Sequence, residues 1–125
     1  MLHFSPQTAI FIAVEPVDFR LGIDGLAQRC RTLLARDPME GSAFVFRNRK
    51  SNAIKILTYD GQGFWLCHKR WSSGRLAWWP KCASYSLSVP ARELQVLLYN
   101  GNPKGANMAG DWRPVNGGSD LSFAA

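Results

Sequence analysis

The sequence is poor in the residues that most enzyme sites need. It has two histidines, His3 and His68, and three cysteines that form no CxxC pair. Neighbouring strand residues point to opposite faces, so Cys67 and His68, adjacent in a predicted strand, are not expected to share a metal or to form a nucleophile and base pair. A Gly-rich phosphate loop of the Walker type is also missing. We therefore expect no catalytic residues, no metal site and no cofactor.

Long apolar segments are absent as well. No stretch approaches the roughly 20 apolar residues that cross a bilayer. The opening MLHFSPQTAIFIAVEP lacks the basic start and the cleavage site of a secretory signal. An odd number of cysteines without paired spacing argues against a disulfide framework and fits a reducing compartment. We expect a soluble, cytoplasmic protein with no membrane partner.

Acidic residues are nearly absent from the segment 47–81. This segment holds eight basic residues and one acid, Asp60, so it carries a charge of +7 in a chain whose net charge is +6. The rest of the chain is close to neutral. A positive field concentrated in one segment is the footprint expected for a polyanion partner.

What the sequence does contain is enough apolar residues for one folded domain. Its 125 residues are 46% hydrophobic, which is typical of a single unit with a packed core. We expect one α+β domain over residues 1–101. Residues 102–125 are rich in glycine and asparagine and show no periodicity, which predicts an irregular or disordered tail.

Hydrophobic periodicity predicts an antiparallel β-meander with one main helix packed on one face. Apolar residues recur at steps of three or four between 18 and 36, which predicts the helix, with Asp18 as its N-cap. A short second helix is expected near the C-terminus, with Pro90 in its first turn. The predicted strands, the first added to a four-stranded meander, are 9–14, 43–46, 53–59, 64–71 and 75–79.

Alternation along these strands predicts which side of the sheet packs on the helix. The core side is expected to hold the apolar residues Phe44, Phe46, Ile54, Ile56, Phe64 and Leu66. The opposite side would mix cations with rings and hold Val45, Arg47, Lys55, Leu57, Tyr59, Trp65, Cys67, Lys69 and Trp71.

A surface of cations and flat rings suits nucleic acid, because Lys and Arg neutralise phosphates and rings stack on exposed bases. In the alternative, purely structural interpretation, Trp65 and Trp71 help bury a second layer, and the cations line a solvated edge strand. A solvated rim usually mixes both signs of charge, and this one does not, which favours nucleic acid. The candidate nucleic-acid-binding residues are Arg47, Arg49, Lys50, Lys55, Lys69, Arg70, Trp71 and Arg75.

Two other functions stay open on these residues. Aromatic side chains often anchor protein interfaces, and a protein interaction module would use Trp65, Trp71, Trp78 and Trp79. A metal-dependent nuclease would need two or three acids around divalent metals, and its candidates are Asp18, Asp24, Asp37 and Asp60. Each of these acids has a local role in a cap, a first helical turn or a chain turn, which disfavours the nuclease.

Three motifs occur in order along the chain: PVDFRLGIDGL, DPMEGSAFVFRNRKSNAIKILTYDGQGFWLCHKRW and SGRLAWWP. Together they resemble the second-open-reading-frame, TnpB-type accessory protein of the insertion sequence 66 family of bacterial mobile elements. The resemblance covers residues 6–80 closely and continues more loosely to about residue 115. Leu21 and Tyr59 stand where this family usually carries lysine and tryptophan.

The resemblance implies a role in transposition, beside a separately encoded transposase that holds the strand-transfer chemistry. Contact with DNA is inferred from the charges and rings rather than from the family. We therefore expect a non-enzymatic accessory protein that binds DNA at the element ends through its basic hairpin. The alternative is a module that docks on the transposase or on another protein of the element.

Overall fold

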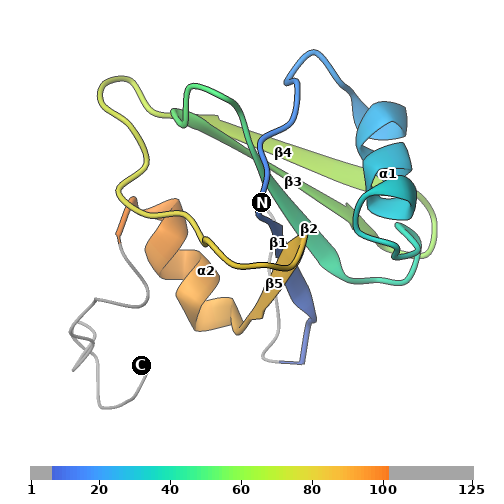
Figure 1. The fold of residues 1–125 in the computed structure, drawn as a ribbon. Coiled ribbons are helices and arrows are strands. Elements are labelled where there is room, and N and C mark those ends of the chain that lie inside the picture. The colour runs from blue at the N-terminus through green and yellow to red at the C-terminus, as the bar shows by residue number, and fades with distance from the viewer. Residues whose placement is uncertain (1–6, 102–125) are drawn as a thin grey trace. The chain divides into compact units, whose positions relative to one another are not determined.

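The computed structural model describes residues 7–101, which divide into two compact units (Figure 1). Within the described residues, the first unit comprises 7–76 and 80–91, and the second comprises 77–79 and 92–101. The irregular tail expected at 102–125 lies outside the described residues.

The first unit is built on a five-stranded mixed sheet in the order β4-β3-β2-β1-β5 (Figure 1). β1 runs parallel to β2, and every other neighbouring pair is antiparallel. Together with two helices, this sheet confirms the predicted α+β class. The elements are β1 (Ile10–Ala13), α1 (Ile23–Thr32), β2 (Ala43–Arg47), β3 (Ala53–Tyr59), β4 (Phe64–Arg70), β5 (Ser86–Val89) and α2 (Ala91–Leu98).

Three strands of the predicted meander, β2, β3 and β4, are antiparallel neighbours as expected. The predicted fourth strand at 75–79 is wrong, because these residues form a loop. The backbone N–H of Leu76 donates to the carbonyl oxygen of Ser51 (2.7 Å), which ties this loop to the turn between β2 and β3. The fifth strand of the sheet is instead β5, which pairs with β1.

The helix α1 is shorter than the helix predicted over 18–36. It begins at Ile23, and its N-cap is Gly22 rather than Asp18. The carboxylate of Asp18 accepts a hydrogen bond from the backbone N–H of Arg20 (2.9 Å). Asp18 therefore closes a turn ahead of the helix, a role that aspartate often takes.

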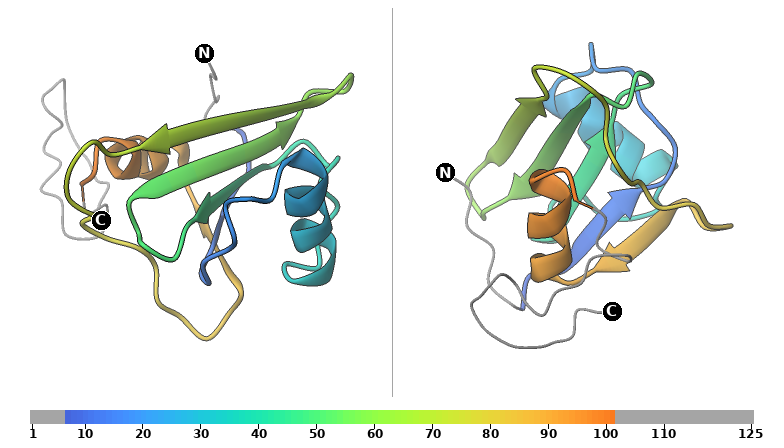
Figure 2. Two further views of the ribbon diagram at one scale, coloured as in Figure 1. Left: turned by 90° about the horizontal axis from the view of Figure 1, so that it is seen from above. Right: turned by 90° about the vertical axis from the view of Figure 1, so that its left-hand side faces the viewer.

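The buried side chains of α1 belong to one hydrophobic cluster with residues of the sheet. Figure 2 shows α1 beside the strands that carry this cluster, from two further directions. No polar side chain of α1 is part of the cluster among the described residues. Its buried members are Ala13, Val17, Leu26, Ala27, Cys30, Leu34, Phe44, Phe46 and Leu57.

The register of β3 corrects its predicted faces. Phe44 lies opposite Leu57, and Phe46 lies opposite Lys55. Since directly opposed residues of an antiparallel pair share one face, Lys55 and Leu57 lie on the side of the two phenylalanines. Ile56 lies on the other side with the residue that it opposes, Val45. The prediction for β3 is wrong by one position, which turns every side chain of the strand to the opposite face.

The prediction for β4 is confirmed, since Phe64 and Leu66 pack against the same cluster as α1. The helix α2 confirms the predicted short second helix, but it begins at Ala91, so Pro90 precedes the helix instead of lying in its first turn. Beyond α2, Asn100 has a φ of 62°, and its side-chain oxygen accepts a hydrogen bond from the backbone N–H of Ala77 (2.7 Å).

Candidate nucleic-acid interface

The turn between β2 and β3, residues 48–52, is held in shape by the side chain of Asn48. Its Oδ1 accepts hydrogen bonds from the backbone N–H groups of Asn52 (3.0 Å) and Ala53 (3.2 Å). Its Nδ2 donates to the side-chain oxygen of Asn52 (2.7 Å). A short polar side chain that bonds to nearby backbone stabilises turns of this kind.

A second contact braces the same turn from β2. Arg47, the last residue of the strand, donates from Nη1 to the hydroxyl oxygen of Ser51 (2.8 Å). Ser51 adopts a φ of 55°, a conformation that non-glycine residues seldom take. Arg49 and Lys50 lie at the turn between these braces, and both are exposed. The turn therefore presents two cations on an ordered backbone.

The loop that follows β4 is fastened to the same turn. The backbone N–H of Trp71 donates to the carbonyl oxygen of Asn52 (2.9 Å), in addition to the bond from Leu76 to Ser51. Because Leu76 is fixed there, its neighbour Arg75 also lies at this end of the sheet.

The cations predicted from the sequence therefore gather at one end of the sheet. Lys69 and Arg70 close β4 and lie opposite Ile54 and Ala53, the first residues of β3. Residues that are separated in sequence by 20 or more positions are brought together by the two hairpin registers. We name the exposed members of this group the basic end of the sheet: Arg49, Lys50, Lys69, Arg70 and Arg75.

Two other predicted residues lie at this end but are half-buried. Burial lowers the pKa of Arg47, and its guanidinium braces the turn through Ser51. The ammonium of Lys69 lies 5.1 Å from the ring centroid of Trp71, a distance at which cation and ring attract. Arg47 and Trp71 thus support the exposed cations of the basic end.

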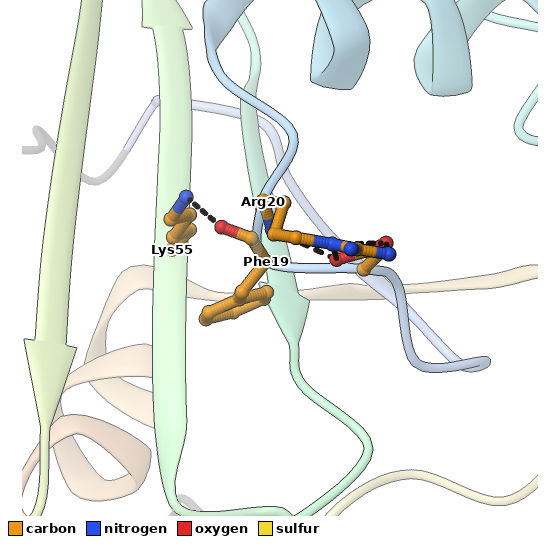
Figure 3. Close-up of polar contacts among 4 residues, drawn as sticks. Phe19, Arg20 and Lys55 are labelled. Atoms are coloured by element: carbon orange, nitrogen blue, oxygen red, sulfur yellow. Dashed lines mark hydrogen bonds and ion pairs between the residues drawn. The ribbon is translucent and has the colours of Figure 1, made fainter.

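Lys55 is separated from the basic end. Only 7% of this residue is exposed. Its Nζ donates to the carbonyl oxygens of Phe19 (2.9 Å; Figure 3) and Leu21 (3.0 Å) and lies 5.0 Å from the Phe19 ring centroid. An ammonium has three donors, and two of them are directed at these carbonyls. We therefore leave Lys55 out of the candidate interface.

The turn before α1 contributes a cation that was not predicted as a site residue. Arg20, with 91% of its side chain exposed, donates from Nη2 (2.8 Å) and Nε (3.1 Å) to Oδ2 of Asp18 (Figure 3). The hydrogen bonds from Arg20, with a smaller contribution from the charge of Arg49, lower the pKa of Asp18 to about 2. Asp18 is thus within electrostatic reach of the basic end. A carboxylate two residues before an arginine is the sequence signal for such a pair.

Acidic and metal-ligating groups do not form a second site in the described part of the chain. Burial, and then the nearby charges of Lys55 and Arg70, lower the pKa of His68. Asp60 is engaged at the β3–β4 turn, where its carboxylate accepts hydrogen bonds from the backbone N–H of Gln62 and Gly63. Within residues 7–101, no three His, Cys, Asp or Glu side chains are grouped as a metal site would require. None of the helices described there has the length and apolarity to cross a membrane.

Comparisons with known proteins agree with the motifs. A family model described as "IS66 Orf2 like protein" matches residues 8–106. Two uncharacterized proteins of Sinorhizobium fredii (strain NBRC 101917 / NGR234) are similar over 98 residues, or 78% of this chain. The protein y4hO is 34% identical over 84% of its length, and y4jC is 37% identical over 83%. No solved structure matches. The resemblance drawn from the motifs is confirmed, and the chain belongs to the IS66 Orf2-like family.

Proposed function

We propose that this chain is an accessory protein of transposition that binds DNA of its insertion element through the basic end of the sheet. The IS66 Orf2-like family is associated with transposition and is not a known catalytic family. DNA binding is supported by one observation: five exposed cations, brought together from two turns and a strand end, lie at one end of the sheet.

The distribution of acids supports the same proposal. Asp60, the one acid among residues 47–81, lies at the β3–β4 turn, and the basic end lies at the opposite ends of those two strands. Asp18, which the charge of Arg49 reaches, is paired with Arg20, and the charge of Glu15 reaches the half-buried Arg47. The side chains of the basic end are exposed, and the energy of binding would come mainly from neutralised phosphates. Such contacts position a protein on DNA without reading base sequence.

The test measures binding of the full chain to duplex DNA from the element ends over a range of salt concentrations, with and without the transposase. The observed binding constant should fall steeply with salt, because bound cations are released from the DNA. The double variant Arg49→Ala/Lys50→Ala should lower the slope of log K against log salt by about 2, in proportion to the two lost contacts.

The matched control is Arg29→Ala/Arg31→Ala. It removes two exposed arginines of α1 and changes the net charge by the same amount. Binding and slope should stay close to those of the unmodified chain. Equal losses in both double variants would mean that net charge, rather than the basic end, governs binding. No DNA binding at about 50 mM salt, where phosphate contacts are strong, would overturn the proposal.

A second candidate function is docking on the transposase, and the exposure of Trp65 favours it. This ring is 56% exposed, and its Nε1 donates to Oδ2 of Asp60 (2.8 Å), which holds the indole in place. A fixed, exposed indole is a typical anchor of a protein interface. Capture of the transposase that is lost in Trp65→Ala and kept in Arg49→Ala/Lys50→Ala, without DNA binding, would support docking instead.

A further inference from the structure

β4 lies at the edge of the sheet. It pairs with β3 on one side, and no strand within residues 7–101 lies on its other side (Figure 2). The pairing with β3 runs without interruption from Phe64 opposite Tyr59 to Arg70 opposite Ala53. The strand contains no proline and no bulge, two of the devices that block an edge, and its cations, which are a third, are confined to the last two positions, Lys69 and Arg70. It is therefore a regular seven-residue edge.

Hydrogen bonds at the two ends of β4 show which backbone groups face this edge. The N–H of Trp71 donates to the carbonyl oxygen of Asn52 (2.9 Å), and the N–H of Asp60 donates to that of Gly63 (3.1 Å). Hydrogen-bonded positions alternate along an antiparallel pair, so the odd-numbered residues of β4 bond to β3. The N–H and C=O groups directed at the open edge are those of Phe64, Leu66, His68 and Arg70.

We propose that a second copy of this chain occupies this edge, with β4 paired antiparallel to β4 about a two-fold axis at Cys67. This axis overlaps the whole strand, since Cys67 is its central residue. The two sheets would join into one, and a two-fold interface of this kind is self-complementary. The proposal does not depend on DNA binding.

The side chains of β4 complement one another in this register. Trp65 would lie opposite Lys69 of the second copy, and Phe64 opposite its Arg70, so each cation meets an aromatic ring. The carboxylate of Asp60 accepts a hydrogen bond from Trp65 (2.8 Å), so Lys69 of the second copy would also lie near a negative charge. An axis at Lys69 would instead place two lysines face to face, which is unfavourable.

The register places the two Cys67 residues directly opposite each other and provides a probe. Their backbones would be a pair without mutual hydrogen bonds, with Cα atoms about 4.5 Å apart, which is within the range of a disulfide. Cys67 is free and half-buried, whereas the other accessible thiol, Cys82, lies outside β4. Cross-linking through Cys67 would therefore report this axis.

The first test measures mass and cross-linking of the full chain. Sedimentation equilibrium should show a species of twice 14.0 kDa that grows with protein concentration. Oxidation with diamide should yield a disulfide-linked dimer. This product should persist in Cys82→Ser and disappear in Cys67→Ser. A linkage that requires Cys82, or a monomer at every concentration, would overturn the proposal.

The second test compares two substitutions of His68. Both remove the ring that packs edge-on against Phe19 (centroids 5.6 Å apart), so both carry the same packing loss. His68→Pro also removes an N–H that points away from β3, which leaves the β3–β4 ladder in place. We expect a dimer from His68→Ala and a monomer from His68→Pro. A dimer that survives in His68→Pro would exclude pairing at this edge.

Two further outcomes separate this proposal from the others. Arg49→Ala/Lys50→Ala should remain dimeric while its DNA binding weakens, so the two proposals can fail independently. If the chain stays monomeric and the transposase blocks modification of Cys67, the edge serves that partner, and pairing with a second copy is excluded.

Discussion

The Nζ of Lys55 donates a hydrogen bond (2.9 Å) to the carbonyl oxygen of Phe19, which lies 36 positions earlier in the sequence. The same ammonium holds the carbonyl oxygen of Leu21 at 3.0 Å. A lysine in the middle of β3 thus fastens the turn before α1 to the sheet. That turn carries the Asp18–Arg20 pair, so one buried cation fixes the place of an exposed one.

Replacing this lysine should destabilise the fold. Lys55→Met keeps an apolar stem but leaves two carbonyls without their donor, so we expect the free energy of unfolding to fall by about 2 to 3 kcal/mol. Lys50→Met removes an exposed lysine and should change it by less than about 0.5 kcal/mol. Urea denaturation measures both values. Equal stability of the two variants would show that the Lys55 contacts contribute little.

The side chain of Asn48 should matter for both stability and binding. Asn48→Ala removes three hydrogen bonds from the turn that carries Arg49 and Lys50, and we expect a loss of about 1 to 3 kcal/mol in unfolding free energy. DNA affinity should fall as the turn loosens, while the salt slope stays the same because no charge is removed. Asn48→Asp retains the Oδ1 acceptor and should lose less stability. Denaturation and salt-dependent binding measure the two effects, and an altered slope in Asn48→Ala would contradict this account.

The pKa of Asp18 can be followed directly by carboxyl NMR titration. Hydrogen bonds from Arg20 lower this pKa from 3.8 to about 2, and Arg20→Ala should return it toward 3.8. Because the pKa is depressed in the folded state, the pair stabilises the fold above about pH 3.8, and this contribution is lost as the pH falls toward 2. A midpoint near 3.8 in the unmodified chain would mean that the pair does not form in solution.

The three cysteines should differ in reactivity. Burial raises the pKa of Cys30 to about 12, so at pH 8 this thiol is both protonated and enclosed, and the thiolate is the reactive form. Cys82 is exposed and Cys67 half-buried. Thiol counting with Ellman's reagent at pH 8 should find two reactive groups in the native chain and three after denaturation. Cys82→Ser should lower both counts by one, whereas a native count of three would place Cys30 at the surface.

The grouping of the cations was predictable because strong turn signals define the two hairpins. The segments RNRKSN and DGQG lie between apolar runs, and the turns fall at these positions in the structure. Once both hairpins are known, Lys69 and Arg70 must lie near the first turn. The grouping of Arg49, Lys50, Lys69 and Arg70 therefore follows from local sequence, whereas the place of Arg75 depends on the bond from Leu76 to Ser51.

The face of β3 was not predictable in the same way. Six of its seven residues are buried, so apolar residues occupy both sides and alternation gives no direction. A charged residue in such a strand normally points to solvent. Lys55 does not, because the carbonyl oxygens of Phe19 and Leu21 accept hydrogen bonds from its ammonium, and that contact depends on tertiary structure.

The missed strand β5 and the wrong strand at 75–79 have one cause. SLSV is a weak β pattern of four residues, whereas RLAWW contains the aromatic residues that favour strands. Pairing partners decide the outcome: β1 offers an edge to β5, and the bond from Leu76 to Ser51 diverts the other segment into a loop. The strand propensity of a segment does not reveal either of these partners, β1 or Ser51.

The position of β1 between β2 and β5 (Figure 1) has a consequence for synthesis on the ribosome. The β2–β3 and β3–β4 hairpins are local in sequence and can form early. β1 is made first, yet its outer neighbour β5 is the last strand to emerge. Until then the nascent chain carries an open, apolar strand edge that is prone to association. A truncated mRNA that ends before codon 86 would therefore yield an aggregation-prone product.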